Sequence, residues 1–185
     1  MANNLHKFTV AEATSKMAQR AIVRVTPTIS TTAYADGDVL FLTTEIPNAV
    51  LFPGGCSLLR GVTIVDKDSN SINMDLVFMA VKKNLIGAVS PGSSGGSAIS
   101  DSDIDAAKML GALEFDIGNG DNTVDIGQAK ITHAAGASGN AATTALPIFL
   151  QAEDGSTSVY FSGITRGTPN HGQTDDLEFA FHIDY

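Results

Sequence analysis

Runs in which apolar and polar residues alternate make up most of the chain after residue 21. In the last run, DLEFAFHIDY, every second residue from Leu177 to Tyr185 is apolar, and Glu178, Ala180, His182 and Asp184 lie between them. Alternation with this period indicates a strand with one face in a core and the other toward solvent. We expect eight or nine such strands.

Turn residues separate these runs and predict how they connect. Asp66–Asn70 lies between CSLLRGVTIVD and SINMDLVFMAV, which predicts a β-hairpin. The run AIVRVTPTIS contains Pro27, which suits an edge strand or a bend because proline cannot donate a ladder hydrogen bond.

Two segments have helical features instead. Thr9 and Glu12 have the spacing of a capping box, and good helix formers follow as far as Ala21. The apolar stripe of this segment is weak, so an extended arm that folds against a partner is the alternative. The run SDSDIDAAKMLG predicts a short helix with acidic residues near its start and Gly111 at its end.

These elements predict an all-β protein: an antiparallel β-sandwich or jelly roll of about eight strands with one or two short helices. Residues 1–20 form an N-terminal arm or helix, and residues 21–185 form a single β-sandwich domain. The chain shows no strand–helix alternation of the kind that builds a parallel α/β fold.

Composition and charge narrow the classes of function. A net charge of −9 repels a phosphate backbone, so we expect no nucleic-acid partner. No apolar run approaches the roughly 18 residues of a membrane helix, and the N-terminus lacks the features of a secretory signal. We therefore expect the protein to be made in a cytoplasm and not to associate with a membrane. Cys56 is the only cysteine, and we expect a small buried side chain there.

The stretch Gly92-Ser93-Ser94-Gly95-Gly96 differs at one position from the Gly-Asp-Ser-Gly-Gly signature of chymotrypsin-like peptidases. A serine nucleophile needs an activating histidine, and in that family the histidine precedes the serine in the chain. Only His6 precedes Ser94, too near the terminus to belong to a barrel. We expect no catalytic residue, and a serine hydrolase using Ser94 is the least favoured reading.

We likewise expect no metal site and no cofactor. The turn DKDSNS begins like an EF-hand loop, but Ser71 and Val77 occupy the positions that need glycine and glutamate. The turn interpretation is therefore preferred, with a weak divalent site across an oligomer interface left open. The acidic run before Gly111 suits a helix N-terminus better than a pair of glycosidase carboxylates. His182 falls in the polar phase of its strand, which indicates a surface histidine.

Binding residues are expected in two places. The connection before the last strand carries Arg166, Pro169, Asn170 and His171, and long loops at the end of a sandwich are common binding sites. In the N-terminal segment, we expect Phe8, Met17 and Arg20 to contact a partner.

The sequence resembles a group of tailed-bacteriophage virion proteins, found particularly in marine phages and cyanophages, that decorate or cement the capsid. The resemblance covers most of residues 20–185. It rests on the Tyr-x-x-Gly-Asp motif of Tyr34–Asp38, Gly54-Gly55 before a core strand, the Asp-rich turn, the segment DIDAAKMLG, and a Tyr-x₅-Arg-Gly-x-Pro segment from Tyr160 to Pro169.

The resemblance implies a jelly-roll-like capsid decoration protein that binds the major capsid protein, often as a homotrimer, at local symmetry axes on the capsid surface. It brings no catalytic residues, so an enzyme is not expected. The expected location is the virion, assembled in the host bacterial cytoplasm. A tail or fibre module that binds host-surface glycans is the alternative, although the chain has no Trp and only three Tyr to stack on sugars.

Overall fold

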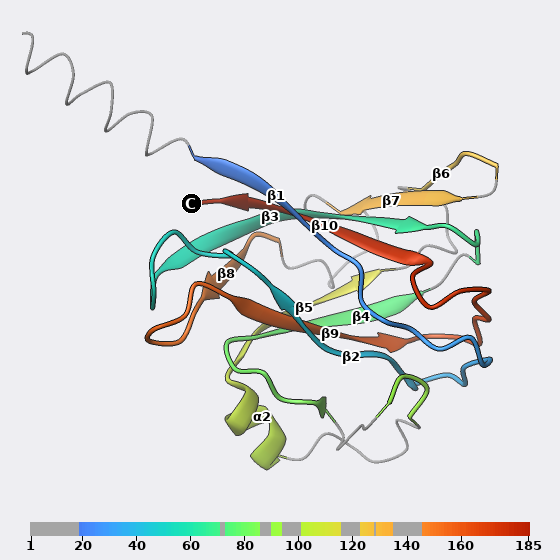
Figure 1. Cartoon of the computed structure of the whole chain (residues 1–185), viewed down its shortest axis with the longest axis horizontal. Coiled ribbons are helices and arrows are strands. Elements are labelled where there is room, and N and C mark those ends of the chain that lie inside the picture. The colour runs from blue at the N-terminus through green and yellow to red at the C-terminus, as the bar shows by residue number, and fades with distance from the viewer. Residues whose placement is uncertain are drawn as a thin grey trace, which may run out of the picture.

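The computed structural model describes residues 19–70, 73–85, 90–93, 101–115, 123–127, 129–134 and 146–185. These residues form two antiparallel sheets packed face to face, with one short helix (Figure 1). The predicted all-β sandwich is thus confirmed. Within these ranges, no helix has the length and apolar composition needed to cross a membrane.

Sheet A has the strand order β1-β10-β3-β7-β6, and β8 also pairs with β3. Its strands are β1 (Arg20–Val25), β3 (Cys56–Asp66), β6 (Thr123–Asp125), β7 (Lys130–Ala134), β8 (Ile148–Gln151) and β10 (Leu177–Asp184). Sheet B has the order β2-β9-β4-β5. Its strands are β2 (Val39–Ile46), β4 (Met74–Met79), β5 (Met109–Phe115) and β9 (Val159–Thr165).

Phenylalanines fill the space between the sheets. Phe41 and Phe161 come from sheet B, and Phe179 and Phe181 come from sheet A. The ring centroids of Phe161 and Phe181 lie 4.8 Å apart, and those of Phe41 and Phe179 lie 5.3 Å apart. Edge-to-face and tilted rings at these separations attract one another in addition to burying apolar area. The phase of the last strand was therefore predicted correctly.

The two outer faces of the sandwich differ. The helix α2 (Asp101–Ala107) lies against the outer side of sheet B (Figure 1). Its Ala107 joins Met79 and Leu85 in a second, small apolar cluster there. No described segment covers the outer face of sheet A in this way (Figure 1).

Three sequence predictions need correction. Asp66–Asn70 is not a hairpin turn, because β3 belongs to sheet A and β4 to sheet B. The helix ends at Ala107, with Lys108 at a φ of 49°, and Gly111 lies within β5 instead. Cys56 is exposed at the start of β3 and not buried.

Two further predictions have a partial outcome. β1 is an edge strand that ends before Pro27, as its sequence indicated. The predicted N-terminal helix falls on residues 1–18, outside the described part of the chain, and Arg20 already belongs to β1.

Candidate functional site

The outer face of sheet A presents large apolar side chains among charged ones. Alternation along β1 and β8 turns Ile22 and Phe149 outward, where they are 57% and 70% exposed. Leu58 is paired with Phe149 and with Asp184, so its side chain shares this face. We call this surface the open face. Its residues are Arg20, Ile22, Arg24, Leu58, Arg60, Phe149, Glu178, His182 and Asp184.

Arginines are concentrated on the open face. The chain has four, and three of them, Arg20, Arg24 and Arg60, lie here. Arg60 is the extra residue at a β-bulge, since Gly61 pairs with His182 while Leu59 pairs with Ile183. The bulge brings the Arg60 guanidinium beside β10.

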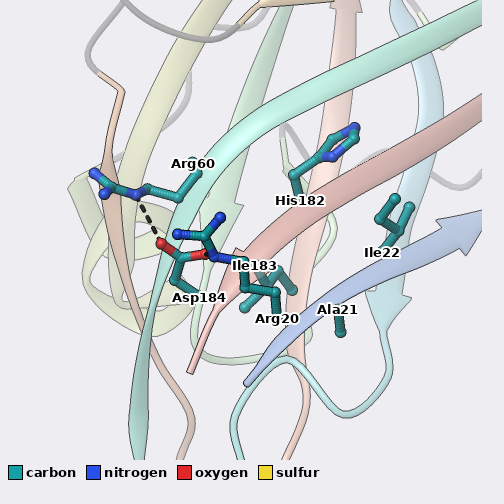
Figure 2. Close-up of a pocket in the computed structure, with 7 residues that line it drawn as sticks. All are labelled: Arg20, Ala21, Ile22, Arg60, His182, Ile183 and Asp184. Atoms are coloured by element: carbon teal, nitrogen blue, oxygen red, sulfur yellow. Dashed lines mark hydrogen bonds and ion pairs between the residues drawn. The ribbon is translucent and has the colours of Figure 1, made fainter. Parts of the chain in front are cut away.

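Asp184 binds two of these arginines. Its carboxylate accepts from Arg60 Nε at 2.9 Å and lies 3.1 Å from Arg20 Nε (Figure 2). These side chains, together with Ile22 and His182, line a hollow of about 530 Å³ between β1, β10 and β3 (Figure 2). The pairs are solvent-exposed and add little stability, so the guanidinium groups can rearrange against a partner.

The loop predicted to bind is folded back on the sandwich. Arg166 is held by Asp75 of β4, which accepts from its Nε at 2.6 Å and raises the pKa of the guanidinium. Pro169 is buried, and its carbonyl accepts from the Tyr34 N–H. Asn170 is exposed. Arg166 and Pro169 therefore have structural contacts, which the sequence did not indicate.

His171 is the residue of this loop that enters a polar cluster. Its side chain is fully buried, and its ring lies edge-on to that of Tyr34. Its Nδ1 is 3.9 Å from the Asp68 carboxylate and 3.4 Å from the Asn70 amide. Burial lowers the pKa of His171, while Asp66, Asp68 and Asp176 act in the opposite direction.

The carboxyl groups of Asp68 and Asp176 lie beside this histidine. The Gly172 N–H donates to Asp68 and holds the pKa of that carboxyl below its usual range. Burial, followed by the hydrogen bond to Asp68, raises the pKa of Asp176. The three residues Asp68, His171 and Asp176 are the group that could hold a metal ion.

Other sequence candidates are separate from both sites. Ser93 donates from Oγ to the Ser90 carbonyl at 2.6 Å, in a turn bonded to Val39. Ser94, Phe8 and Met17 lie outside the described residues. Asp101 and Asp103 occupy the first turn of α2, which confirms the helix interpretation of that acidic run.

Sequence reasoning missed most of the open face and Asp176. Phe149 had a usable signal, because it shares its phase with Gln151 while Ile148 and Leu150 point inward. A large apolar residue in the outward phase of a strand is a reason to look for a contact. Asp176 had no such signal, because its partner Asp68 is far away in the sequence.

Neither a protein-family model nor a curated protein sequence matches this chain.

Proposed function

We propose that this protein is a capsid decoration protein of a tailed bacteriophage. It binds the major capsid protein on the outside of the head as a homo-oligomer, which we expect to be a trimer. The proposed role is structural and requires no catalysis. Repetition over a symmetric shell makes individually weak contacts effective, because each additional contact of a bound oligomer is intramolecular.

The open face is the observation that carries this proposal. It combines an exposed aromatic ring, Phe149, with an exposed aliphatic side chain, Ile22, and three arginines. Aromatic residues and arginine are enriched in protein–protein interfaces, whereas lysine and glutamate are depleted there. Such a face, on a sheet that no described segment covers, suits a protein partner.

The strand order also supports the proposal. Sheet A contains the strands β1-β10-β3-β8 side by side, and they face β2-β9-β4-β5 of sheet B. The chain crosses from one sheet to the other at each connection from β1 to β4. This is the order in which a jelly roll arranges eight strands, and jelly rolls are common in viral capsids. The fold alone does not determine a function, so this support is by analogy.

The motifs behind the resemblance have structural roles here that agree with a shared fold. Tyr34 donates from its hydroxyl to the Leu40 carbonyl, and its ring packs beside His171. Asp38 accepts from the Ala35 N–H and so closes the turn at Gly37. These residues join the loop before β2 to the loop before β10.

Co-sedimentation with phage heads tests the proposal. Purified protein is mixed with expanded heads assembled from the major capsid protein of the phage that encodes it. We expect the wild type to pellet with the heads and Phe149→Glu to stay in the supernatant, because a carboxylate would be buried in the contact. Phe149→Glu should melt at the wild-type temperature, since the side chain is exposed.

Ile104→Glu is the matched control, because Ile104 is 41% exposed on α2, on the opposite side of the sandwich. It should pellet like the wild type. Wild-type protein that never pellets would refute the decoration role, and binding to glycans instead would favour a tail or fibre module. Equal pelleting of wild type and Phe149→Glu would refute the assignment of the open face.

A further inference from the structure

The cluster of Asp68, His171 and Asp176 brings three possible metal ligands together. One ring nitrogen and one oxygen of each carboxyl group lie within 4.8 Å of one another. The 3.9 Å between His171 Nδ1 and Asp68 Oδ2 is too long for a hydrogen bond. Two ligand bonds of about 2.0–2.2 Å through a shared cation span distances up to about 4.4 Å.

A second observation is that the buried His171 ring is poorly hydrogen-bonded. The His171 side chain has no exposed surface, and its Nε2 has no hydrogen-bond partner among the described residues. Buried polar atoms are nearly always paired. Its Nδ1 has only the Asn70 amide at 3.4 Å, which is beyond the usual range for a good hydrogen bond. The His171 ring is thus buried in the cluster without the good hydrogen bonds that usually satisfy its two nitrogens.

The charges of the cluster also favour a cation. The carboxyl groups of Asp68 and Asp176 lie in the same small cluster, and the negative charges of two neighbouring carboxylates repel each other unless a cation lies between them. No ion pair joins either of them to a lysine or arginine in the described part of the chain.

Backbone groups orient the three side chains. The Gly172 N–H donates to Asp68 Oδ2 at 2.5 Å, and the Gln173 N–H donates to Asp176 Oδ2 at 2.6 Å. Supporting hydrogen bonds of this kind fix the ligands of metal sites. The Asp68 side chain is partly exposed, which gives an ion a route in from solvent and lets this ligand move toward the other two.

We propose that Asp68, His171 and Asp176 bind a divalent transition-metal ion, with water completing the coordination. One imidazole with two carboxylates is a ligand set for Zn²⁺, whereas Ca²⁺ and Mg²⁺ prefer oxygen ligands alone. The ion joins the turn after β3 to the loop before β10. This inference stands independently of capsid binding.

Zn²⁺ titration of the full chain tests the site. The protein is stripped with EDTA, dialysed and titrated with ZnCl₂ at pH 7.5 by calorimetry, and its Tm is measured with and without Zn²⁺. We expect one Zn²⁺ per chain and a rise in Tm of about 5–10 °C when the metal exceeds its Kd by about 100-fold. CaCl₂ and MgCl₂ should produce much smaller shifts.

Two variants identify the ligands. Asp176→Asn keeps the shape of the side chain and an acceptor for the Gln173 N–H, and Asp68→Asn does the same at a ligand whose side chain is 29% exposed. Each should weaken Zn²⁺ binding by about 10–100-fold or more. Asp175→Asn is the control, because Asp175 is a neighbouring carboxylate with a side chain 65% exposed, outside the cluster. It should bind Zn²⁺ like the wild type.

Absence of both heat and a Tm shift at millimolar Zn²⁺ would overturn the proposal. So would Zn²⁺ binding that survives in both Asp68→Asn and Asp176→Asn, since the ion would then be elsewhere. A larger response to Ca²⁺ than to Zn²⁺ would overturn the assignment of a transition metal.

Discussion

Gly163 of β9 lies under the ring of Phe41 in the middle of the core. It pairs with Phe41 on one side and with Leu76 on the other. A Cβ at this position would be 2.4 Å from Phe41 Cε1, a distance that requires the ring or a strand to move. The position needs glycine for space in a packed interior, not for an unusual backbone conformation.

Gly163→Ala should therefore destabilise the protein by about 1–3 kcal/mol, the usual cost of overpacking a core. Urea denaturation measures the change. Gly167→Ala is the control, because a Cβ there meets no atom within 4 Å. The double variant with Phe41→Leu should recover part of the loss. Equal stability of Gly163→Ala and Gly167→Ala would contradict this packing argument.

Because His171 is buried, the free energy of unfolding should depend on pH. Burial lowers its pKa in the folded state below the ordinary value of 6.5, so the unfolded chain binds a proton before the folded one does. This contribution to stability is present above pH 6.5 and is lost as the pH falls toward the folded-state pKa. In metal-free buffer, the free energy of unfolding should change with pH by at most about 1.4 kcal/mol per pH unit through this group, which is the value for one bound proton.

The measurement compares wild type with His171→Gln in urea at several pH values. The difference between them should shrink as the pH falls below 6.5. Asp176 acts with the opposite sign, because its raised pKa means that its contribution grows as the pH falls. Asp176 is present in both proteins, so its contribution cancels in the difference except for the part by which His171 itself lowers the pKa of Asp176. A difference that does not change with pH would exclude His171 as the source.

The sequence made part of this cluster visible. The sequence predicted a binding loop that contains Pro169, Asn170 and His171, and it placed Asp68 in a turn. Their contact joins residues about a hundred positions apart, as in the Gly172–Asp68 hydrogen bond. Local patterns carry no information about such a pair, so the cluster itself was not predictable.

The connection from β3 to β4 shows the same limit at the scale of elements. Both strands alternate correctly, and both place their apolar side chains inward. A strand of either sheet in a sandwich has this pattern, because both inner faces contribute to one core. The pattern therefore predicts each strand and its phase, but not whether the next strand pairs with it or faces it.

Asp66 is the residue that turns the chain from one sheet to the other. Its buried carboxylate accepts from the Asp68 N–H at 3.1 Å and from the Asn70 N–H at 2.8 Å. Ser69, between these two, has a φ of 58°. The carboxylate thus satisfies two backbone donors where the ladder of β3 ends.

Asp66→Ala should cost about 1–3 kcal/mol in unfolding free energy, because it leaves both donors without their acceptor. Asp175→Ala removes a carboxylate from an exposed site nearby and should change stability by less than about 0.5 kcal/mol. Both changes are measured by urea denaturation. Equal losses in the two variants would mean that the turn does not depend on the Asp66 hydrogen bonds.

Helix α2 shows why the end of an element is harder to predict than its start. The acidic residues of its first turn were recognised from sequence. Its end was expected at Gly111, but Lys108 adopts the left-handed conformation that usually favours glycine. Gly111 is used for packing, since a Cβ there would be 3.1 Å from Ile148 Cγ2. Glycine can end a helix or make room for a neighbouring side chain, and the sequence alone does not show which of these a given glycine does.

The whole molecule has two outer faces of different character. One is covered by α2, while the other exposes apolar groups and three of the four arginines of a chain with a net charge of −9. The overall composition predicted an acidic protein and gave no sign of this local concentration of arginines. Only the strand register, which brings β1, β3 and β10 together, assembles the open face.

The described core is built from side chains between Val23 and Tyr185. If residues 1–18 form an arm, as the sequence predicts, a chain beginning at Gln19 should keep the wild-type Tm to within about 2 °C. If the first residues reach a neighbouring subunit, as expected for Phe8 and Met17, the shortened chain should instead lose its oligomeric state or its binding to heads. Thermal melting, light scattering and co-sedimentation measure these properties separately. A large fall in Tm would place residues 1–18 in the folded body, and unchanged assembly with unchanged Tm would exclude their role as an arm.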